Sequence, residues 1–322
     1  MKTIEELQKI IQNEIKNITY PDNPKELYQP ISYVLDGTGK NLRPLLTLLS
    51  YNMYNNDISL AIKPALGIEM FHNFTLVHDD IMDKAPLRRN KQTIHHKWNE
   101  NVAILSGDAM MILSFKFFFE LPPDIQLNVI KLFTQTALEV CEGQQYDMNF
   151  ESINDVSLSQ YMEMIRLKTA VLIATSLKIG AIIAKAPESD TELLYQSGIK
   201  LGLAFQIQDD YLDVYGNTST FGKNTGNDIV TKKKTFLLIN ALEKANPEQK
   251  KLILETLNSN IEREIKIKTI INLYNELGIA EITKQKIIQL SNESLSLIDK
   301  LTTKNKSQFI KQIINELINR NF

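Results

Sequence analysis

This sequence has little cysteine, proline or glycine, and each shortage narrows the kinds of protein it can be. Cys141 is the single cysteine among 322 residues. No disulfide can therefore form within the chain, which indicates a reducing compartment. No proline follows Pro247, and no glycine occurs between Gly226 and Gly278. Long stretches without these residues, with apolar side chains recurring at steps of three and four, predict helices.

A large charge excess and long apolar runs are also missing. The 36 basic and 38 acidic residues leave a net charge of -2, which argues against a nucleic-acid partner. The longest apolar stretch, Ala170 to Ala184, is interrupted by Lys178 and is shorter than the ~20 residues that span a bilayer. The first residues lack the apolar core of a signal peptide. We therefore expect a cytoplasmic protein without stable membrane insertion.

The apolar periodicity predicts an all-α protein. Hydrophobic residues make up 43% of the chain, enough for a sizeable core, and few runs show the strict alternation of strands. No internal repeat or low-complexity linker separates parts of the chain, so we expect one domain over residues 1–322. The helices are expected at roughly 4–18, 25–35, 42–55, 58–83, 101–120, 124–150, 157–184 and 190–215, followed by several shorter amphipathic helices within 232–322.

The pattern Asp-Asp-x-x-Asp occurs twice, each time at the end of a long apolar segment. Residues three and four apart share a helix face, so each set of three carboxylates should crowd one patch. Such carboxylates repel one another unless cations neutralise them, and their hard oxygens suit Mg²⁺ together with phosphate. One copy alone would indicate a solvated acidic face, whereas two copies in apolar surroundings favour a clamp for a diphosphate. The two sets are Asp79, Asp80 and Asp83, and Asp209, Asp210 and Asp213.

Basic residues flank both motifs. Lys40 and Arg43 lie at the expected start of a helix, where the backbone favours anions. Arg88 and Arg89 follow the first motif, and their guanidinium groups can fork onto phosphate oxygens. Each group alone is equally explained by a turn, a solvated charge or a salt bridge to the aspartates.

Polar residues also interrupt apolar helical segments. His72 precedes Asp79 by two helical turns, and alone it would be read as a hydrogen-bonded core residue. Gln144 and Asp147 are three apart on another helix, and Lys168 interrupts an apolar run, where a lysine needs an anionic partner.

These motifs occur in the order found in trans-type polyprenyl diphosphate synthases, which the chain resembles from about Gly37 to Thr235. The segments are GKNLRP, FHNFTLVHDDIMD, LRRN, AILSGDAMM, GQQYD, KTA, FQIQDDYLDV, FGKNTGND and KKKT. The resemblance implies a helical bundle around a central apolar cavity, binding three Mg²⁺ ions, and a homodimer formed through the helix around Ala103–Phe119. The departures, among them Thr38, Asn41 and Asn90, remove no ligand.

The resemblance also implies a role for each matching residue. The metal ligands would be Asp79, Asp83 and Asp209, supported by Asp80, Asp210 and Asp213. The allylic diphosphate would contact Arg88, Lys168, Lys223 and Lys233. Isopentenyl diphosphate would contact Lys40, Arg43, His72 and Arg89. Gln144 belongs with the substrate-binding residues, and Thr169 and Gln206 would place oxygens near the developing allylic cation.

The implied product is C20 geranylgeranyl diphosphate, with C15 farnesyl diphosphate as the shorter possibility. In this family the growing chain runs along the helix that bears the first motif, and aromatic residues before the motif form the floor. Phe74 with Thr75, and Phe71 nearly one turn below, resemble the geranylgeranyl pattern. The alternative is that these phenylalanines are core packing and that another helix, near Phe115–Phe119, forms the floor.

Three other functions remain open at this point. A terpene cyclase usually replaces the second aspartate motif, and a non-catalytic regulatory subunit of a synthase tends to lose one motif. A di-iron bundle would need paired Glu-x-x-His motifs, which the sequence lacks. Two intact motifs, together with Lys40, Arg43 and Arg89, favour a synthase that binds two diphosphates.

Overall fold

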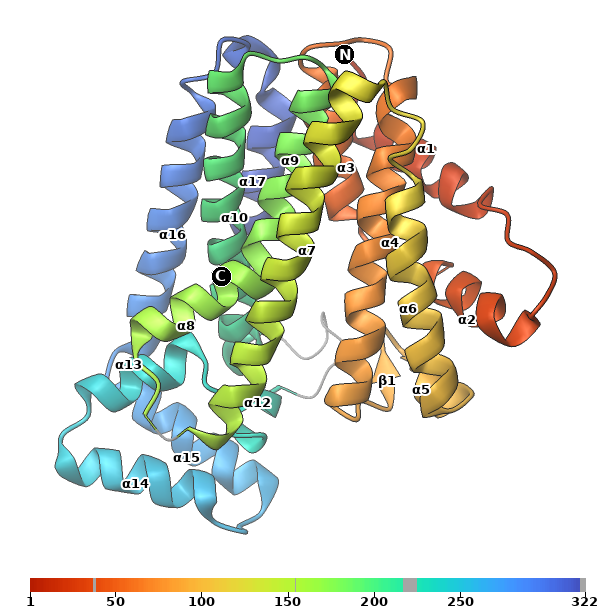
Figure 1. Cartoon of the computed structure of the whole chain (residues 1–322). Helices are drawn as coiled ribbons and strands as arrows, with labels where there is room; N and C mark the ends of the chain where they lie inside the picture. The colour runs from red at the N-terminus through yellow and green to blue at the C-terminus, as the bar shows by residue number, and fades with distance from the viewer. Residues whose placement is uncertain (37–38, 154, 217–224, 319–322) are drawn as a thin grey trace. The chain divides into compact units, whose positions relative to one another are not determined.

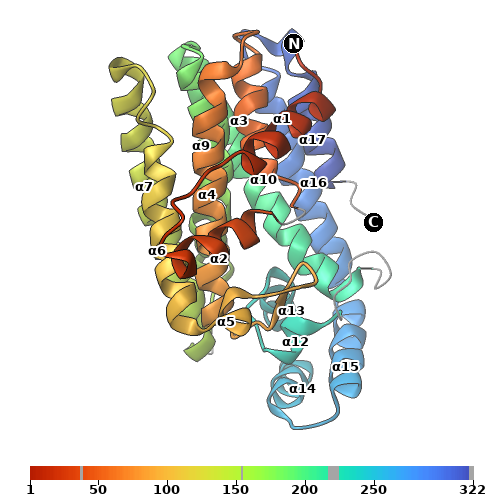
Figure 2. The same cartoon turned by 90° about the vertical axis from the view of Figure 1, so that its right-hand side faces the viewer.

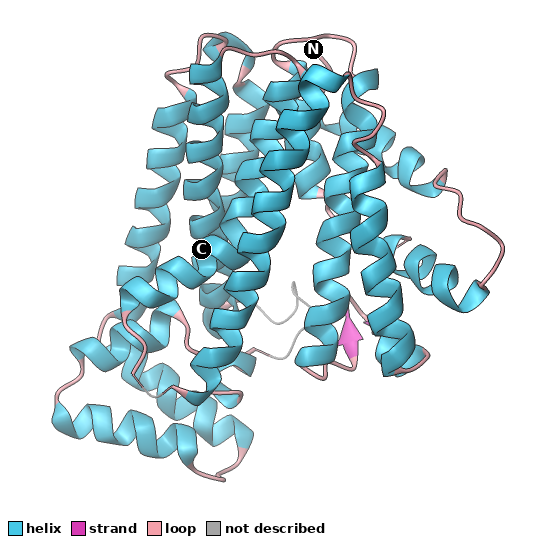
Figure 3. Ribbon diagram, in the orientation of Figure 1, coloured by secondary structure: helices cyan, strands magenta, loops and turns pink. Residues whose placement is uncertain are grey.

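The computed structural model describes residues 1–36, 39–153, 155–216 and 225–318. These residues are almost entirely helical, as Figures 1 and 3 show, so the predicted all-α class is confirmed. The chain divides into two compact units. The first comprises Met1–Thr134, Thr175–Leu194 and Leu301–Ile310, and the second comprises Gln135–Ala174, Tyr195–Lys300 and Lys311–Phe322. The single domain over 1–322 stays a prediction.

The first unit is built around α4 (Ser59–Met82), which packs against α3 (Leu42–Asn52) and α6 (Glu100–Lys116). Most of α4 is buried, as its apolar composition on all sides predicts. Figure 2 shows α1 (Ile4–Lys16) and α2 (Lys25–Leu35) lying across this layer. A short hairpin of β1 (Leu87–Arg88) and β2 (Lys91–Gln92) follows α4 and leads into α5 (Ile94–Lys97).

The second unit contains most of α7 (Pro123–Ser152) and of α10 (Glu188–Tyr215), which carries the second aspartate motif. Its remaining helices are shorter, and those after residue 232 agree with the shorter helices predicted there (Figures 1 and 2). They are α8 (Leu158–Ile165), α12 (Asn227–Val230), α13 (Phe236–Lys244), α14 (Pro247–Asn258), α15 (Arg263–Glu276), α16 (Ile279–Ile298) and part of α17 (Gln308–Ile318).

The segment expected as one helix over 157–184 is interrupted. Between α8 and α9 (Val171–Ile183) the chain forms a π-helical turn, η1 (Arg166–Ala170). Such turns shift the side chains that follow and are frequent at functional sites. The turn includes Lys168 and Thr169, two of the residues that the sequence analysis singled out.

Among the described residues, no helix has both the length and the apolar composition that crossing a lipid bilayer requires.

Candidate active site

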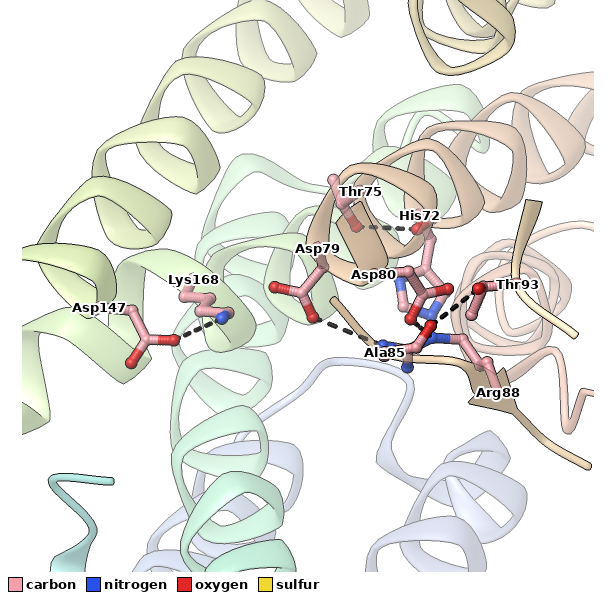
Figure 4. A network of polar contacts seen from close by, with 9 residues as sticks. All are labelled: His72, Thr75, Asp79, Asp80, Ala85, Arg88, Thr93, Asp147 and Lys168. Carbon is pink, nitrogen blue, oxygen red and sulfur yellow. Dashed lines mark hydrogen bonds and ion pairs between the residues drawn. The ribbon is translucent and has the colours of Figure 1, made fainter. Parts of the chain in front are cut away.

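The first aspartate motif lies at the C-terminal end of α4, and its three carboxylates differ in burial. Asp80 is 5% exposed, Asp79 is half-buried, and Asp83 is exposed at the helix C-cap. Arg88 Nε donates to Asp80 Oδ1 at 2.6 Å, and Arg88 Nη2 lies 3.6 Å from Asp79 Oδ2 (Figure 4). Burial, only partly opposed by Arg88, raises the pKa of Asp80 to about 6. The helical spacing predicted one shared patch, but Asp80 faces the interior and holds Arg88.

Arg89 is presented by the tip of the hairpin between β1 and β2. Arg89 and Asn90 both have left-handed backbone conformations, with φ of 51° and 61°, as a two-residue type I′ turn requires. Asparagine tolerates this region almost as well as the glycine that the family often has. A Cβ added at Gly39 would lie 2.6 Å from Arg89 Nη1. The glycine therefore lets Arg89 approach the segment that carries Lys40.

Arg43 joins the start of α3 to the middle of α4. Its Nη1 lies 3.0 Å from His72 Nε2. Burial, together with the charges of Arg43, Arg89 and Arg88, lowers the pKa of His72 well below 6.5. The imidazole is therefore neutral, and Nε2 accepts because a guanidinium can only donate. Within the first unit, Arg43 and His72 are therefore in contact, and Arg89 lies beside Gly39.

In the second motif, on α10, the middle aspartate is again buried and the outer two are more exposed. Asp209 is exposed, Asp213 is half-buried, and Asp210 is 4% exposed. Asp210 Oδ2 accepts from Tyr161 Oη at 2.5 Å and from the backbone N–H of Phe236 at 3.0 Å. Although burial raises the pKa of Asp210, these donors favour its ionised form. Asp210 therefore ties α10 to α8 and to the start of α13.

Gln206 extends this network toward the π-helical turn. Its Nε2 donates to Asp210 Oδ1 at 3.2 Å, and its Oε1 accepts from Thr169 Oγ1 at 2.9 Å. The last aspartate of the motif, Asp213, accepts a hydrogen bond at Oδ2 from the backbone N–H of Asp228, at 2.9 Å. The second unit thus places Thr169 and Gln206 in contact, next to the aspartate motif.

Lys168 is held by Asp147, a residue that the sequence analysis noticed but did not place among the site residues. Lys168 Nζ lies 2.6 Å from Asp147 Oδ2 (Figure 4). Burial alone would raise the pKa of Asp147, but the charges of Lys233 and Lys168 lower it below its usual range. A Cβ at Gly143 would lie 2.2 Å from the backbone nitrogen of Lys168, so α7 and the π-helical turn are in close contact. In the sequence, the only sign of this role of Asp147 was that it lies three residues after Gln144, so that both polar side chains share one face of a helix.

The carboxylate oxygens of the two aspartate motifs suit a hard divalent cation. Asp80 and Asp210 are buried against protein donors, whereas Asp79 with Asp83 and Asp209 with Asp213 are more exposed. Mg²⁺ typically takes one or two carboxylates and fills its shell with water and phosphate, so these oxygens fit it. Within the described ranges, no three His, Cys, Asp or Glu side chains gather closely enough to hold an ion by themselves. Lys223, the remaining cation predicted for the allylic site, lies outside the described residues.

The two candidate floors for the product belong to one phenylalanine cluster. Phe74 is buried and lies 5.3 Å from Phe71, ring centre to ring centre. Phe71 packs on Phe133 at 5.2 Å, and Phe133 also contacts Phe115 and Phe118. The residues before the first motif and the alternative segment around Phe115–Phe119 therefore form a single apolar layer in the first unit. Thr75 instead donates its hydroxyl to the backbone carbonyl of His72 at 2.8 Å.

Comparison with known proteins places this arrangement among prenyl-chain enzymes. The family model described as polyprenyl synthetase matches residues 24–274. A short chain isoprenyl diphosphate synthase from Methanocaldococcus jannaschii is 38% identical, covering 83% of this chain and 81% of the relative. A geranylgeranyl pyrophosphate synthase from Geoglobus acetivorans is 34% identical over 98% of both chains. A crystal structure of a geranylgeranyl pyrophosphate synthase matches with a TM-score of 0.94 and 41% identity, covering 100% of both chains.

Proposed function

This chain belongs to the polyprenyl synthetase family and is a prenyltransferase, and from that premise we propose that it condenses isopentenyl diphosphate with an allylic diphosphate to form C20 geranylgeranyl diphosphate. One observation carries the proposal: two aspartate motifs end α4 and α10, the first beside Arg88, which Asp80 holds, and the second linked through Gln206 and Thr169 to the turn that carries Lys168. The names of full-length relatives support the C20 product.

Enzymes of this family generally depend on Mg²⁺, and we assign three ions here. Asp79, Asp83 and Asp209 would hold them, with water-mediated support from Asp213. When bound, the ions neutralise the diphosphate of the allylic substrate and stabilise the charge on the departing group. Asp80 and Asp210 would act differently, because their oxygens already hold Arg88 in the one case and Tyr161 and Gln206 in the other.

The fixed cations divide between two diphosphates. Arg88, Lys168, Lys233 and Lys223 would bind the allylic diphosphate. Lys40, Arg43, His72 and Arg89 would bind isopentenyl diphosphate, with the neutral His72 orienting Arg43. Thr169, Gln206 and Gln144 would present polar oxygens along the reacting chain.

These residues act at successive steps of the condensation. The carbon–oxygen bond of the allylic diphosphate breaks, and the electron pair leaves with the diphosphate toward the fixed cations. The double bond of isopentenyl diphosphate then attacks the allylic carbon and forms a new carbon–carbon bond. Loss of a proton, for which the released diphosphate is the base, restores a double bond. Apolar walls exclude the water that would otherwise capture the cation.

We also propose a homodimer formed through α6. Leu105 and Ile112 lie seven residues apart on this helix, on the same face, and are 60% and 62% exposed. Phe119, just beyond the helix, is 60% exposed. Large apolar side chains that cluster on a surface in this way mark interaction sites. A cytoplasmic location stays a prediction from the sequence.

The test is incubation of the purified protein with Mg²⁺, isopentenyl diphosphate and dimethylallyl, geranyl or farnesyl diphosphate. We expect C20 prenyl diphosphate and one inorganic diphosphate per condensation. A cyclic hydrocarbon formed without isopentenyl diphosphate would identify a terpene cyclase. No product from the protein alone, with activity only beside a partner synthase, would identify a regulatory subunit.

A further inference from the structure

His78, directly before the first aspartate motif, is a partly buried residue to which the proposed reaction assigns no role. It lies on α4, its side chain is 22% exposed, and its Nε2 lies 3.2 Å from the backbone carbonyl oxygen of Ile104 on α6. Because a carbonyl oxygen only accepts, Nε2 carries the proton and is the donor of this hydrogen bond. Asp108 Oδ1, 3.8 Å from the same nitrogen, is too far away for a second one. The bond to Ile104 therefore anchors the imidazole to α6.

Gly107 of α6 leaves the space that the His78 ring occupies. A Cβ added at Gly107 would lie 2.2 Å from His78 Nε2 and 2.4 Å from its Cδ2, closer than unbonded atoms approach. Any larger residue at position 107 would therefore displace the ring. The position of the imidazole between the two helices thus depends on a glycine that admits it and a carbonyl that holds it.

The His78 ring also packs on Phe74, one turn earlier on α4. The ring centres lie 4.9 Å apart and the ring planes are inclined by 70°, an edge-to-face arrangement that aromatic rings favour. Phe71 contacts Phe74 as well, at 5.3 Å. Because residues three and four apart share a helix face, Phe71, Phe74 and His78 form one row along α4. Within this row, His78 links Phe74 to α6.

A floor for the product requires that the Phe74 ring keep one position. Phe74 is 7% exposed, and a phenylalanine ring with empty space beside it can turn into another rotamer. His78 fills that space. Its directional hydrogen bond gives the imidazole one orientation, which an aliphatic side chain of similar size would not have.

We propose that His78 is a positioning residue for product length: anchored to the Ile104 carbonyl, it holds the Phe74 ring at the end of the path of the growing chain. This inference rests on the proposed function and on Phe74 as the floor. His78 acts through Phe74, so its effect should be seen in the length of the product rather than in the rate alone.

The test measures product length in His78→Ala, His78→Phe, Gly107→Ala and the double variant of His78→Ala with Gly107→Ala. We expect His78→Ala to raise the ratio of products longer than C20 to C20 itself roughly two- to tenfold, as expected for the loss of one aromatic pair. His78→Phe keeps a ring beside Phe74 and should retain most of the C20 product. Gly107→Ala should change the product distribution only while His78 is present, because the added methyl group displaces that ring. His96→Ala, at an exposed histidine of α5, is the control and should match the wild type.

An unchanged product distribution in His78→Ala, with or without a lower Tm, would overturn the inference, and so would an equal shift in His96→Ala. If His78→Ala fails to fold, Gly107→Ala decides the question, and wild-type product from this variant would overturn the inference.

The proposed function is judged separately. If the wild type and His96→Ala form no condensation product, that function fails, and the inference fails with it. If both are active and Phe74→Leu lengthens the product while His78→Ala does not, only the role of His78 fails. If His78→Ala lengthens the product but Phe74→Leu does not, His78 does not act through Phe74, and the inference is again overturned.

Discussion

Lys168 Nζ and Asp147 Oδ2 lie 2.6 Å apart, in a pair whose side chains are 23% and 17% exposed, and this contact joins the π-helical turn to the C-terminal part of α7. The turn advances the chain so that Lys168 meets Asp147 while its neighbour Thr169 meets Gln206. Consecutive residues of a helical segment point about 100° apart, so these two neighbours reach two different helices, α7 and α10.

We predict that Asp147→Asn weakens the allylic site. Lys168 loses the charge that fixes it, and breaking a largely buried pair from one side costs about 3 kcal/mol or somewhat less at this exposure. The KM for the allylic substrate should rise and kcat should fall by one to two orders of magnitude (~10–100-fold). Glu163→Gln is the matched control, since it removes the partner of Arg166 at a more exposed position and should change activity little. Wild-type kinetics in Asp147→Asn would contradict this role.

A second prediction distinguishes two aspartates of the first motif: Asp79, which we assign to the metal ions, and Asp80, which is buried. Asp79→Asn should lower turnover by several orders of magnitude and raise the Mg²⁺ concentration needed for half-maximal rate. Asp80→Asn should leave that Mg²⁺ concentration unchanged, because Asp80 is buried against Arg88, but it should weaken binding of the allylic diphosphate. Titrating Mg²⁺ and substrate against each variant separates the two. The same Mg²⁺ shift in both variants would show that Asp80 is a ligand after all. By the same reasoning, Asp209→Ala should behave like Asp79→Asn.

The pKa of His72 predicts how stability changes with pH. The histidine is held neutral in the fold, with a pKa well below 6.5, whereas in the unfolded chain it takes up a proton near pH 6.5. The unfolded state therefore binds more protons below that pH, and the folded protein loses stability as the pH falls below 6.5, by at most about 1.4 kcal/mol per pH unit. His72→Gln keeps an acceptor for Arg43 and should lose less stability over the same range. Urea unfolding between pH 5 and 7.5 measures the difference, and parallel curves would reject the prediction.

The helices could be predicted because they depend on local sequence. Periodic apolar residues define α4 and α10. Of the residues expected to bind isopentenyl diphosphate, Arg43 and His72 lie in contact. The burial of Asp80 and Asp210 could not be predicted in the same way. Apolar residues precede both motifs, and adjacent aspartates follow them, so the sequence pattern does not show which aspartate faces the interior.

Contacts between segments that are far apart in the sequence could not be predicted either. The approach of Gly143 to the backbone of Lys168, and of Gly39 to Arg89, depends on how helices and loops pack. The π-helical turn has no reliable sequence signal, and two-residue strands are too short for alternation to reveal them. Asp147 was therefore noticed as a polar residue on a helix, but its partner was not identified.

The exposed face of α6 predicts an oligomeric state that mutation can disrupt. Placing a charge at Leu105, as in Leu105→Asp, should turn a homodimer into monomers, because a buried unpaired carboxylate opposes association. Ile288→Asp, at an exposed isoleucine on α16, is the control and should leave the dimer intact. Light scattering at micromolar concentration measures the mass. A wild-type monomer, or a dimer that survives Leu105→Asp, would contradict the assignment.

The last prediction concerns the length of the product, which depends on the phenylalanine cluster. Phe74 is 7% exposed, and its ring lies between those of Phe71 and His78, 5.3 and 4.9 Å away. If Phe74 is the floor, removing part of its ring leaves room for further isoprene units. Phe74→Leu should then shift the product beyond C20 at a moderate cost in stability, whereas Phe74→Ala should shift it further at a cost of about 3–5 kcal/mol.

The alternative is that Phe74 only supports the core and that Phe115 or Phe118 forms the floor. In that case Phe74→Leu lowers Tm without changing the product, and Phe115→Leu changes the product instead. Phe150→Leu, at a buried phenylalanine of α7 outside the cluster, controls for general loss of packing and should leave the chain length unchanged. Chromatography of the dephosphorylated products distinguishes these outcomes. A wild-type product longer than C20 would reject the assigned chain length itself, because the intact Phe74 ring is then no barrier.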